Sequence, residues 1–354
     1  MKFVAFYHEI FEKHKAEAHP ESPKRVKAII SELMKIEELE IIKPKKANKR
    51  ILENVHAKEY IDKVFELCKK AKEFGKEVYL DPDTYINEFT CEASLYAIGS
   101  IIQGIDLALK KKINSFFAIV RPPGHHAGIY GNALNAPTQG FCIFNNVAIG
   151  ASYLIEKKFN RILILDIDAH HGNGTQEIFY KTNKVFYISL HQDPSTIYPN
   201  TGFVNEIGEF EGKGYNLNIP LPIRSGDDVY RKAFEEIINP IVEKYKPKFI
   251  LASLGFDSHR SEFLTMLNLT INSFELVFKF LKNIQEERKI PIGFVLEGGY
   301  NENVLREGSK ILAKIFLERR YKIKEIPTKS EDFILSQSKE TFDKIKSLLE
   351  GIWF

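Results

Sequence analysis

The chain has 354 residues, 44% of them hydrophobic, which is enough for one enzyme-sized domain with a large core. The 50 basic and 47 acidic residues give a formal net charge of +3, so no overall field attracts nucleic acid or a membrane surface. The sequence has no apolar run near the roughly 20 residues of a membrane span. Cys68, Cys91 and Cys142 lack metal-type spacing and cannot all pair, and with no secretory leader evident we expect a reducing cytoplasm.

Amphipathic helical patterns alternate with short apolar runs along the chain. Ser22 followed by Pro23 predicts a helix start, because serine caps helices and proline fits their first turn. Asn301 predicts the cap of a helix that runs toward Arg319, and Pro240 predicts a kink or break. Further helices are expected over residues 89–112, 146–158, 228–245 and 272–288. Residues 321–354 have a helical pattern of unclear role, which we expect to pack as the tail of one domain over residues 1–354.

Five apolar runs have the composition of buried strands, at residues 116–120, 162–165, 185–188, 249–254 and 292–296. Each run leads into polar residues, such as His125 and His126 after the first run and Asp257 after the fourth. Strands that alternate with helices predict a parallel sheet with helices on both faces. Ligands of such sheets bind beyond the carboxyl ends of the strands, so we expect a functional site at that edge.

The segment from Asp166 to Gly174 follows the second run and carries the clearest chemical pattern. Alternate side chains of an extended chain share one face, so Asp166, Asp168 and His170 are expected to project together. Carboxylate oxygen and imidazole nitrogen are suitable ligands for zinc or a similar divalent ion. A solvated polar loop is the simpler alternative, but the same pattern at five strand ends favours an assembled site.

Several segments, taken in order, resemble the zinc-dependent histone deacetylase family in its class II-like, prokaryotic form, together with the related acetylpolyamine amidohydrolases. The resemblance covers residues 1 to about 315 and rests on His19–Arg25, Arg121–Ala127, Gly140–Cys142, Asp166–Gly174, Ser189–His191, Gly255–Asp257 and Glu297–Tyr300. It implies an arginase-like α/β fold, a three-layer αβα sandwich with a central, mostly parallel eight-stranded sheet.

The resemblance implies a zinc site formed by Asp168, His170 and Asp257, the last of which is also placed by its strand-end position. Three protein ligands leave a position open for water and substrate, as in catalytic zinc sites. Two carboxylates formally neutralise Zn²⁺, so the ion acidifies water less than it does in a site of three histidines. A general base is therefore needed, and His125 and His126 resemble the family's tandem histidines.

Three further residues are implied as partners in this chemistry. Asp166 matches the residue that hydrogen-bonds the first histidine, and Asn173 matches the residue that orients the second, where many relatives have aspartate. An amide stabilises an imidazolium less than a carboxylate does, so Asn173 should make His126 less basic. Tyr300 resembles the tyrosine that donates to the carbonyl oxygen as negative charge develops.

The resemblance also implies a structural potassium site and an acyl-chain tunnel. The potassium site is matched by Asp166, Ser189 and Leu190, with the backbone carbonyls of Asp168 and His170. The tunnel is matched by Gly140, Phe141, Tyr198 and Leu264. Aromatic walls suit a methylene chain that loses its hydration on entry, while ordinary packing is the alternative for Tyr198 and Leu264.

Two features bear on the substrate. The loop from Ala127 to Gly140 is longer than in compact relatives and lies beside the expected mouth of the site. It could narrow access to the site, mediate self-association or have no function, and these alternatives stay open. Leu264 matches a gate position at which a polyamine-selective relative has glutamate, and a carboxylate there would attract a cationic polyamine. The absence of that charge favours acyl-lysine, although Glu262 lies nearby and weakens this inference.

Together these residues predict a zinc-dependent hydrolase that removes acetyl, or a related acyl group, from a primary amine, with acetyl-lysine of proteins preferred. Acetylated polyamines and other small acyl-amines are the alternative substrates. A binuclear manganese ureohydrolase of similar architecture is the rival enzyme class, but its aspartate-rich motif is not visible here. A non-catalytic acyl-lysine binding protein would have lost a zinc ligand or Tyr300, and all of them are present.

Overall fold

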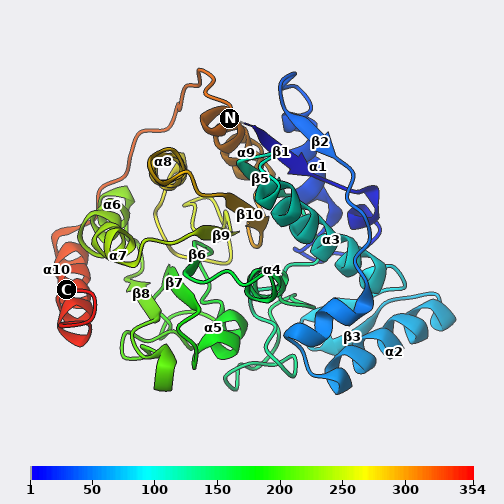
Figure 1. Cartoon of the computed structure of the whole chain (residues 1–354). Coiled ribbons are helices and arrows are strands. Elements are labelled where there is room, and N and C mark those ends of the chain that lie inside the picture. The colour runs from blue at the N-terminus through cyan, green and yellow to red at the C-terminus, as the bar shows by residue number, and fades with distance from the viewer. Residues whose placement is uncertain (1) are drawn as a thin grey trace.

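Eight strands form one sheet at the centre of the computed structural model, which describes residues 2–354 (Figure 1). They are β1 (Phe3–Phe6), β2 (Glu40–Ile42), β5 (Ser115–Ala118), β6 (Ile162–Asp166), β7 (Val185–Gln192), β8 (Asn216–Leu221), β9 (Phe249–Leu254) and β10 (Ile292–Leu296). Their spatial order is β2-β1-β5-β10-β9-β6-β7-β8, and every neighbouring pair is parallel. The predicted eight-stranded sheet is confirmed, and it is parallel throughout rather than mostly parallel.

The five predicted apolar runs are consecutive in space, as β5, β10, β9, β6 and β7. All residues of β6, β9 and β10 are buried, because helices cover both faces of a parallel sheet. The shared strand direction brings the carboxyl ends to one edge. At that edge Asp166 of β6 lies in register with Ser189 of β7 and Ser253 of β9, so the polar strand ends meet there.

Helices flank this sheet (Figure 1). On one side α3 (Thr90–Leu109) packs on β5 and β10, α4 (Asn146–Glu156) on β9 and β6, and α5 (Asn173–Phe179) on β7. A second group of helices packs together, consisting of α1 (Pro23–Leu33), α9 (Glu302–Phe316), α8 (Ile271–Arg288) and α6 (Asp227–Ala233). The remaining elements are η1 (Glu9–Glu12), η2 (Lys49–Asn54), α2 (Lys58–Phe74), η3 (Phe210–Gly212) and the antiparallel pair β3 (Val78–Asp81) and β4 (Thr84–Ile86).

The helix starts follow the sequence signals, with one irregularity. Asn301 caps α9 through its side chain, which accepts from the backbone N–H of Asn303 at 3.0 Å. Ser22 precedes α1, but its side chain makes no capping hydrogen bond. The pattern over residues 228–245 is divided into α6, a π-helical turn η4 (Phe234–Ile238) and α7 (Asn239–Tyr245). The irregularity precedes Pro240, which lies in the first turn of α7, where a missing N–H costs no hydrogen bond.

The C-terminal tail wraps back onto the β8 edge of the sheet. Residues 317–331, which we call the strap, run from α9 to α10 (Asp332–Leu348) without regular secondary structure (Figure 1). Helix α10 packs on α6, η4 and β8. Near the C-terminus Trp353 is buried, and its ring centroid lies 5.2 Å from that of Phe186 and 5.5 Å from that of Tyr215. The tail is therefore packed, as predicted, but its helix begins at Asp332, so the helical pattern expected from residue 321 is wrong over residues 321–331.

The cysteines do not behave as predicted. Cys68 of α2 and Cys91 of α3 form a disulfide, and Cys142 is a buried free thiol. Disulfides persist in oxidising surroundings or in intracellular proteins of hyperthermophiles, so the pair no longer supports the inference of a reducing compartment from the cysteines. Spacing gave no sign of the pair, which is 23 residues apart and is brought together only by the packing of α2 on α3. Within residues 2–354, none of the helices has the length and apolar character needed to span a bilayer.

Candidate active site

The carboxyl ends of β6 and β9 bring the three predicted metal ligands together. Asp168 and His170 follow β6, Asp257 follows β9, and their ligand atoms all lie within 4.8 Å of one another. The Nδ1 of His170 lies 2.8 Å from Oδ2 of Asp257 and 3.2 Å from Oδ1 of Asp168. Both carboxylates are buried, and two buried anions side by side are costly without a cation. Two carboxylates and one imidazole therefore fit a divalent ion such as zinc.

Backbone groups hold both carboxylates in place. Oδ2 of Asp168 accepts from the N–H of Gly298 at 2.7 Å, and Oδ1 of Asp257 accepts from the N–H of Ala169 at 2.9 Å. A Cβ at position 298 would lie 2.5 Å from Oδ2 of Asp168 and 2.6 Å from Oδ2 of Asp257. Only glycine allows the backbone to approach this closely, which explains the first glycine of the Glu297–Tyr300 segment.

The pKa values of His170 and Asp257 depend on the charges beside them. Burial disfavours the imidazolium of His170, but hydrogen bonds and charge from Asp168 and Asp257 raise its pKa to about 9. Burial and the charge of Asp168 raise the pKa of Asp257 to about 7. Both shifts reflect an excess of negative charge that a bound cation would neutralise.

The tandem histidines lie beside this group and have different partners. The Nδ1 of His125 lies 3.0 Å from Oδ2 of Asp166, and the Nδ1 of His126 lies 2.8 Å from Oδ1 of Asn173. Both rings are buried, and their centroids are 4.0 Å apart. The structure thus places each histidine against the partner that the resemblance implied for it.

The two histidines differ in basicity. Burial opposes the charged form of His125, but the charges of Asp166 and Asp168 raise its pKa to about 10. Burial, followed by the positive charge of His125, holds the pKa of His126 well below its ordinary value. The hydrogen bond that Oδ1 of Asn173 accepts from His126 opposes this lowering and does not overcome it. These shifts favour the neutral form of His126 and the charged form of His125.

The loop from Ala127 to Gly140 is fastened to α5 beside His126. The Nδ2 of Asn173 donates to the carbonyl of Ala133 at 2.9 Å, and the Glu177 carboxylate accepts from the backbone N–H of Ile129 at 2.9 Å. Tyr130 is 72% exposed near the start of the loop. The loop is thus an attached part of the site rim with one protruding aromatic side chain.

Tyr300 follows β10 and reaches the same region from the opposite side. Its ring centroid lies 6.0 Å from that of Phe141 and 6.2 Å from that of Phe263. The guanidinium carbon of Arg25 lies 4.9 Å from the Tyr300 ring centroid, and its Nε donates to the carbonyl of Gly299 at 2.6 Å. Within residues 2–354 the Tyr300 hydroxyl makes no hydrogen bond, so it is available to a ligand.

Three of the four predicted tunnel residues surround His126 and Tyr300. The ring centroid of Tyr198 lies 4.9 Å from that of His126. Gly140 has a φ of +52°, and a Cβ there would lie 2.6 Å from Cδ2 of His126 and 2.8 Å from Cε1 of Tyr198. Leu264 is half-buried in the loop after β9, and the aromatic contact with Tyr300 comes instead from its neighbour Phe263.

The residues of the predicted potassium site lie on adjacent strands. Asp166 and Ser189 are in register, and Leu190 is buried next to them. The Oγ of Ser189 lies 2.7 Å from Nδ1 of His191. Oδ2 of Asp166 also accepts from the Tyr187 hydroxyl at 3.0 Å, a contact that the sequence did not indicate.

Two glutamates to which the sequence gave no role hold the site loops. Oε2 of Glu297 accepts from the N–H groups of Gly124 at 2.8 Å and His125 at 3.2 Å. Oε1 of Glu262 accepts from the N–H groups of Tyr300 and Asn301, both at 2.9 Å. In the sequence these glutamates were marked only by their position in or near a motif. Hydrogen bonds from a side chain to the backbone of another loop do not depend on a fixed spacing, so they could not be predicted.

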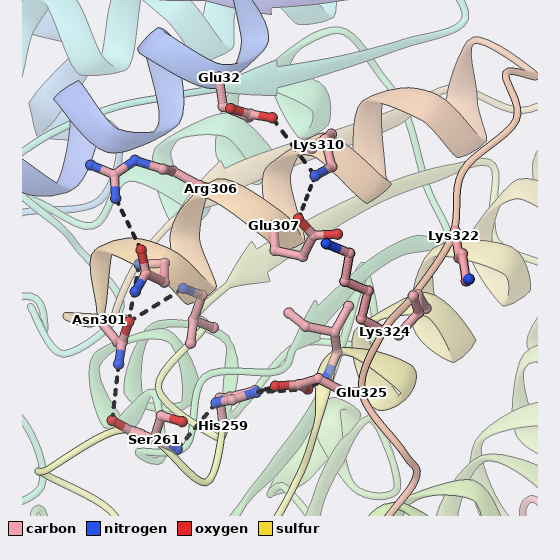
Figure 2. Close-up of a pocket in the computed structure, with 14 residues that line it drawn as sticks. Glu32, His259, Ser261, Asn301, Arg306, Glu307, Lys310, Lys322, Lys324 and Glu325 are labelled. Carbon is pink, nitrogen blue, oxygen red and sulfur yellow. Dashed lines mark hydrogen bonds and ion pairs between the residues drawn. The ribbon is translucent and has the colours of Figure 1, made fainter.

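The strap contacts the loop that carries Asp257. Nε2 of His259 lies 3.1 and 3.0 Å from the two carboxylate oxygens of Glu325, as Figure 2 shows. The same carboxylate accepts from the N–H of Ile271, the first residue of α8, at 2.9 Å. These side chains line a cavity of about 540 Å³ beside α9, whose lining includes none of the predicted catalytic residues.

Comparison with known proteins agrees with this geometry. Residues 19–316 match the model of the histone deacetylase domain. A probable deacetylase of Archaeoglobus fulgidus is 37% identical over 304 residues, which are 84% of this chain and 81% of the relative. An uncharacterized protein of Methanocaldococcus jannaschii is 36% identical over 332 residues, or 93% and 90% of the two chains. A crystal structure described as the HDA15 HD domain superposes with a TM-score of 0.87 at 29% identity, covering 99% of this chain and 95% of that one. The chain therefore belongs to the histone deacetylase family.

Proposed function

We propose that this chain is a zinc-dependent deacetylase that removes acetyl, or a related acyl group, from a primary amine. The observation that carries the proposal is the convergence of Asp168, His170 and Asp257 within 4.8 Å, beside two histidines and a free tyrosine hydroxyl. When bound, zinc supplies Lewis-acid chemistry, which polarises an amide carbonyl and makes nearby water more acidic. Family membership supports the reaction class, and the local geometry supports the metal.

In this proposal His126 is the general base. It is neutral, and its Nδ1 is engaged with Asn173, so Nε2 is the atom that takes a proton from the attacking water. The same nitrogen then returns the proton to the leaving amine. His125 keeps its own proton through Asp166 and places a positive charge beside the reacting carbonyl.

Tyr300 supplies the second stabilising group. Its hydroxyl donates to the carbonyl oxygen as negative charge develops there. Arg25 lies under the ring and holds the carbonyl of Gly299, which keeps the tyrosine in position. The rings of Phe141 and Tyr198 form apolar walls that favour an extended methylene chain over water.

The surroundings of Glu262 favour acetyl-lysine over an acetylated polyamine. Oε1 of its carboxylate accepts from the backbone of Tyr300 and Asn301, Oε2 has no hydrogen bond within residues 2–354, and the residue is only 7% exposed. This burial limits contact between Glu262 and a polycation, and Leu264 offers no charge. A small acyl-amine deacetylase is the alternative within the same chemistry.

A structural potassium ion at Asp166, Ser189 and Leu190 belongs to the same proposal. Parallel strands β6 and β7 place Asp166 and Ser189 in register, and oxygen donors suit a hard monovalent cation. Such an ion would stabilise the backbone turn that carries Asp168 and His170.

Metal removal and reconstitution test the proposal. Protein stripped by a chelator should lose acetate release from an acetyl-lysine peptide and regain it with one equivalent of zinc. Activity that needs two manganese ions per chain would instead identify a binuclear ureohydrolase. Peptide binding without turnover in the zinc-loaded protein would identify a non-catalytic acyl-lysine binding protein.

A further inference from the structure

A second group of metal-ligating side chains lies next to the proposed zinc ligands and shares none of them. His125, Cys142 and Glu297 each offer one ligand atom, and these atoms all lie within 4.8 Å of one another. The exposed fractions of the three residues are 2%, 0% and 0%. They belong to the segment after β5, the segment before α4 and the end of β10, so the fold gathers them rather than local spacing.

One carboxylate oxygen in this group has no partner. Oε2 of Glu297 is fixed by the N–H groups of Gly124 and His125, whereas Oε1 is buried and has no hydrogen bond within residues 2–354. A buried carboxylate oxygen without a donor is costly, and such an atom usually marks a missing proton, water or ion. Burial also raises the pKa of Glu297 to about 7, which reflects the same lack of compensation.

The other two donors also keep a ligand atom available. Cys142 is the free thiol, and its only contact of note is a long hydrogen bond of 3.5 Å from the N–H of His126. His125 uses Nδ1 for Asp166, and its Nε2, which lies 3.8 Å from Oδ1 of Asp168, can coordinate an ion once it loses its proton. Sulfur, nitrogen and oxygen together suit Zn²⁺ or Cd²⁺, because magnesium and calcium prefer oxygen alone.

We propose that His125, Cys142 and Glu297 form a second, inhibitory site for a thiophilic divalent cation such as Zn²⁺. Binding releases the thiol proton of Cys142 and the Nε2 proton of His125 to solvent, and the thiolate and the Glu297 carboxylate then balance the two positive charges of the ion. The two ligand sets share no residue, so this is not the bridged arrangement of binuclear hydrolases.

An ion bound at the second site coordinates Nε2 of His125, which is then no longer available to the reacting groups. Excess zinc should therefore inhibit the enzyme, a consequence that rests on the proposed function. The binding itself does not depend on that function. The experiment on binding and the experiment on inhibition can therefore give independent outcomes.

Cadmium titration of the zinc-loaded full chain tests the binding. We expect wild-type protein to take up one further ion, with the ultraviolet absorption of a thiolate–cadmium bond. Cys142→Ser should keep its zinc and lose both the further ion and the absorption. This variant retains Cys68 and Cys91, so any signal from those residues would persist. Glu297→Gln should weaken cadmium binding about tenfold or more, since even an outer contact of a metal site carries that cost.

Two results would overturn the site: no cation beyond the first in wild-type protein, or equal uptake by wild type and Cys142→Ser. For inhibition, each protein is compared with its own acetate release at one equivalent of zinc. Excess zinc should inhibit wild type and spare Cys142→Ser, and equal inhibition of both would contradict the inhibitory role. If the chain hydrolyses no amide at all, the cadmium titration still decides whether the site exists.

Discussion

The side chain of Asn173 accepts one hydrogen bond and donates another, whereas a carboxylate can only accept. Its Oδ1 faces Nδ1 of His126, while its Nδ2 donates to the carbonyl of Ala133 in the rim loop. The resemblance identified the first contact, since it depends on a position within a motif. The second was not predictable, because it depends on where the Ala127–Gly140 loop folds.

Asn173→Asp should raise the pKa of His126, because a carboxylate stabilises the imidazolium. A base that must be neutral loses activity as pH falls through its pKa, so a raised pKa moves the acid limb of the kcat/KM profile to higher pH. We expect a shift of about one pH unit. Asn132→Asp is the control, since it removes the loop contact to the Ala136 carbonyl without touching His126. An acid limb at the wild-type pH, with zinc retained, would remove His126 from the role of base.

Tyr300→Phe should lower kcat by roughly 10²- to 10³-fold, the usual contribution of one oxyanion donor. The Tyr300 hydroxyl makes no hydrogen bond within residues 2–354, so the melting temperature and zinc content should not change. Tyr198→Phe is a matched control, because that hydroxyl donates to the carbonyl of Thr138 rather than to a ligand. Equal kcat for Tyr300→Phe and wild type would mean that Tyr300 only packs.

At the scale of elements, five neighbouring strands of the sheet were predictable, whereas β1, β2, β8 and the strap were not. Runs such as Ile292–Leu296 are continuously apolar because both faces of the sheet are covered, and that pattern identifies buried parallel strands. Residues 317–331 form no helix, although a helical pattern was expected from residue 321, and nothing in that pattern showed that Glu325 reaches His259. The π-helical turn was also not located. Pro240 predicted a kink or break, but the irregularity lies before the proline, at Phe234–Ile238.

Glu325 contacts the loop that follows Asp257, so Glu325→Ala should disturb the position of the site residues without touching them. Loss of the contacts to His259 and Ile271 allows the 257–265 loop to shift, and small shifts of reacting groups are costly. We expect kcat/KM to fall about tenfold while zinc remains bound. Lys322→Ala, an exposed neighbour in the strap, should leave kcat/KM unchanged. If Glu325→Ala matched that control, the strap would be only a connection to α10.

At the scale of the whole molecule, the sequence predicted the parallel sheet and the edge at which the polar strand ends meet, since both depend on the pattern at strand ends. The set of metal ligands stays a prediction, although the structure brings Asp168, His170 and Asp257 together. Contacts between distant segments were not predictable. Cys68 and Cys91 pair across two helices, and Arg25 of α1 reaches the carbonyl of Gly299 after β10. Such contacts are set by packing, which leaves no spacing signal in one sequence.

The shape of the site also sets a chain length for the substrate. Acetyl-ornithine lacks one methylene, worth about 0.8 kcal/mol of burial, and its carbonyl stops short of the reacting groups. We expect kcat/KM for acetyl-ornithine peptides to fall at least about tenfold below that for acetyl-lysine peptides. Acetyl-lysine should also exceed acetylspermidine, since Leu264 offers a polyamine no charge. A large advantage for acetylspermidine would reverse the substrate preference and leave the reaction class intact.

The most direct test of the central claim is the zinc content and acetate release of Asp257→Ala, measured on one preparation beside wild type. Asp257 is one of three protein ligands in the proposed site, and loss of one ligand should remove both the metal and the turnover. We predict one zinc per chain with acetate release in wild type, and neither in a folded Asp257→Ala protein. Stoichiometric zinc with wild-type turnover in the variant would show that Asp257 is not a ligand and would contradict the account.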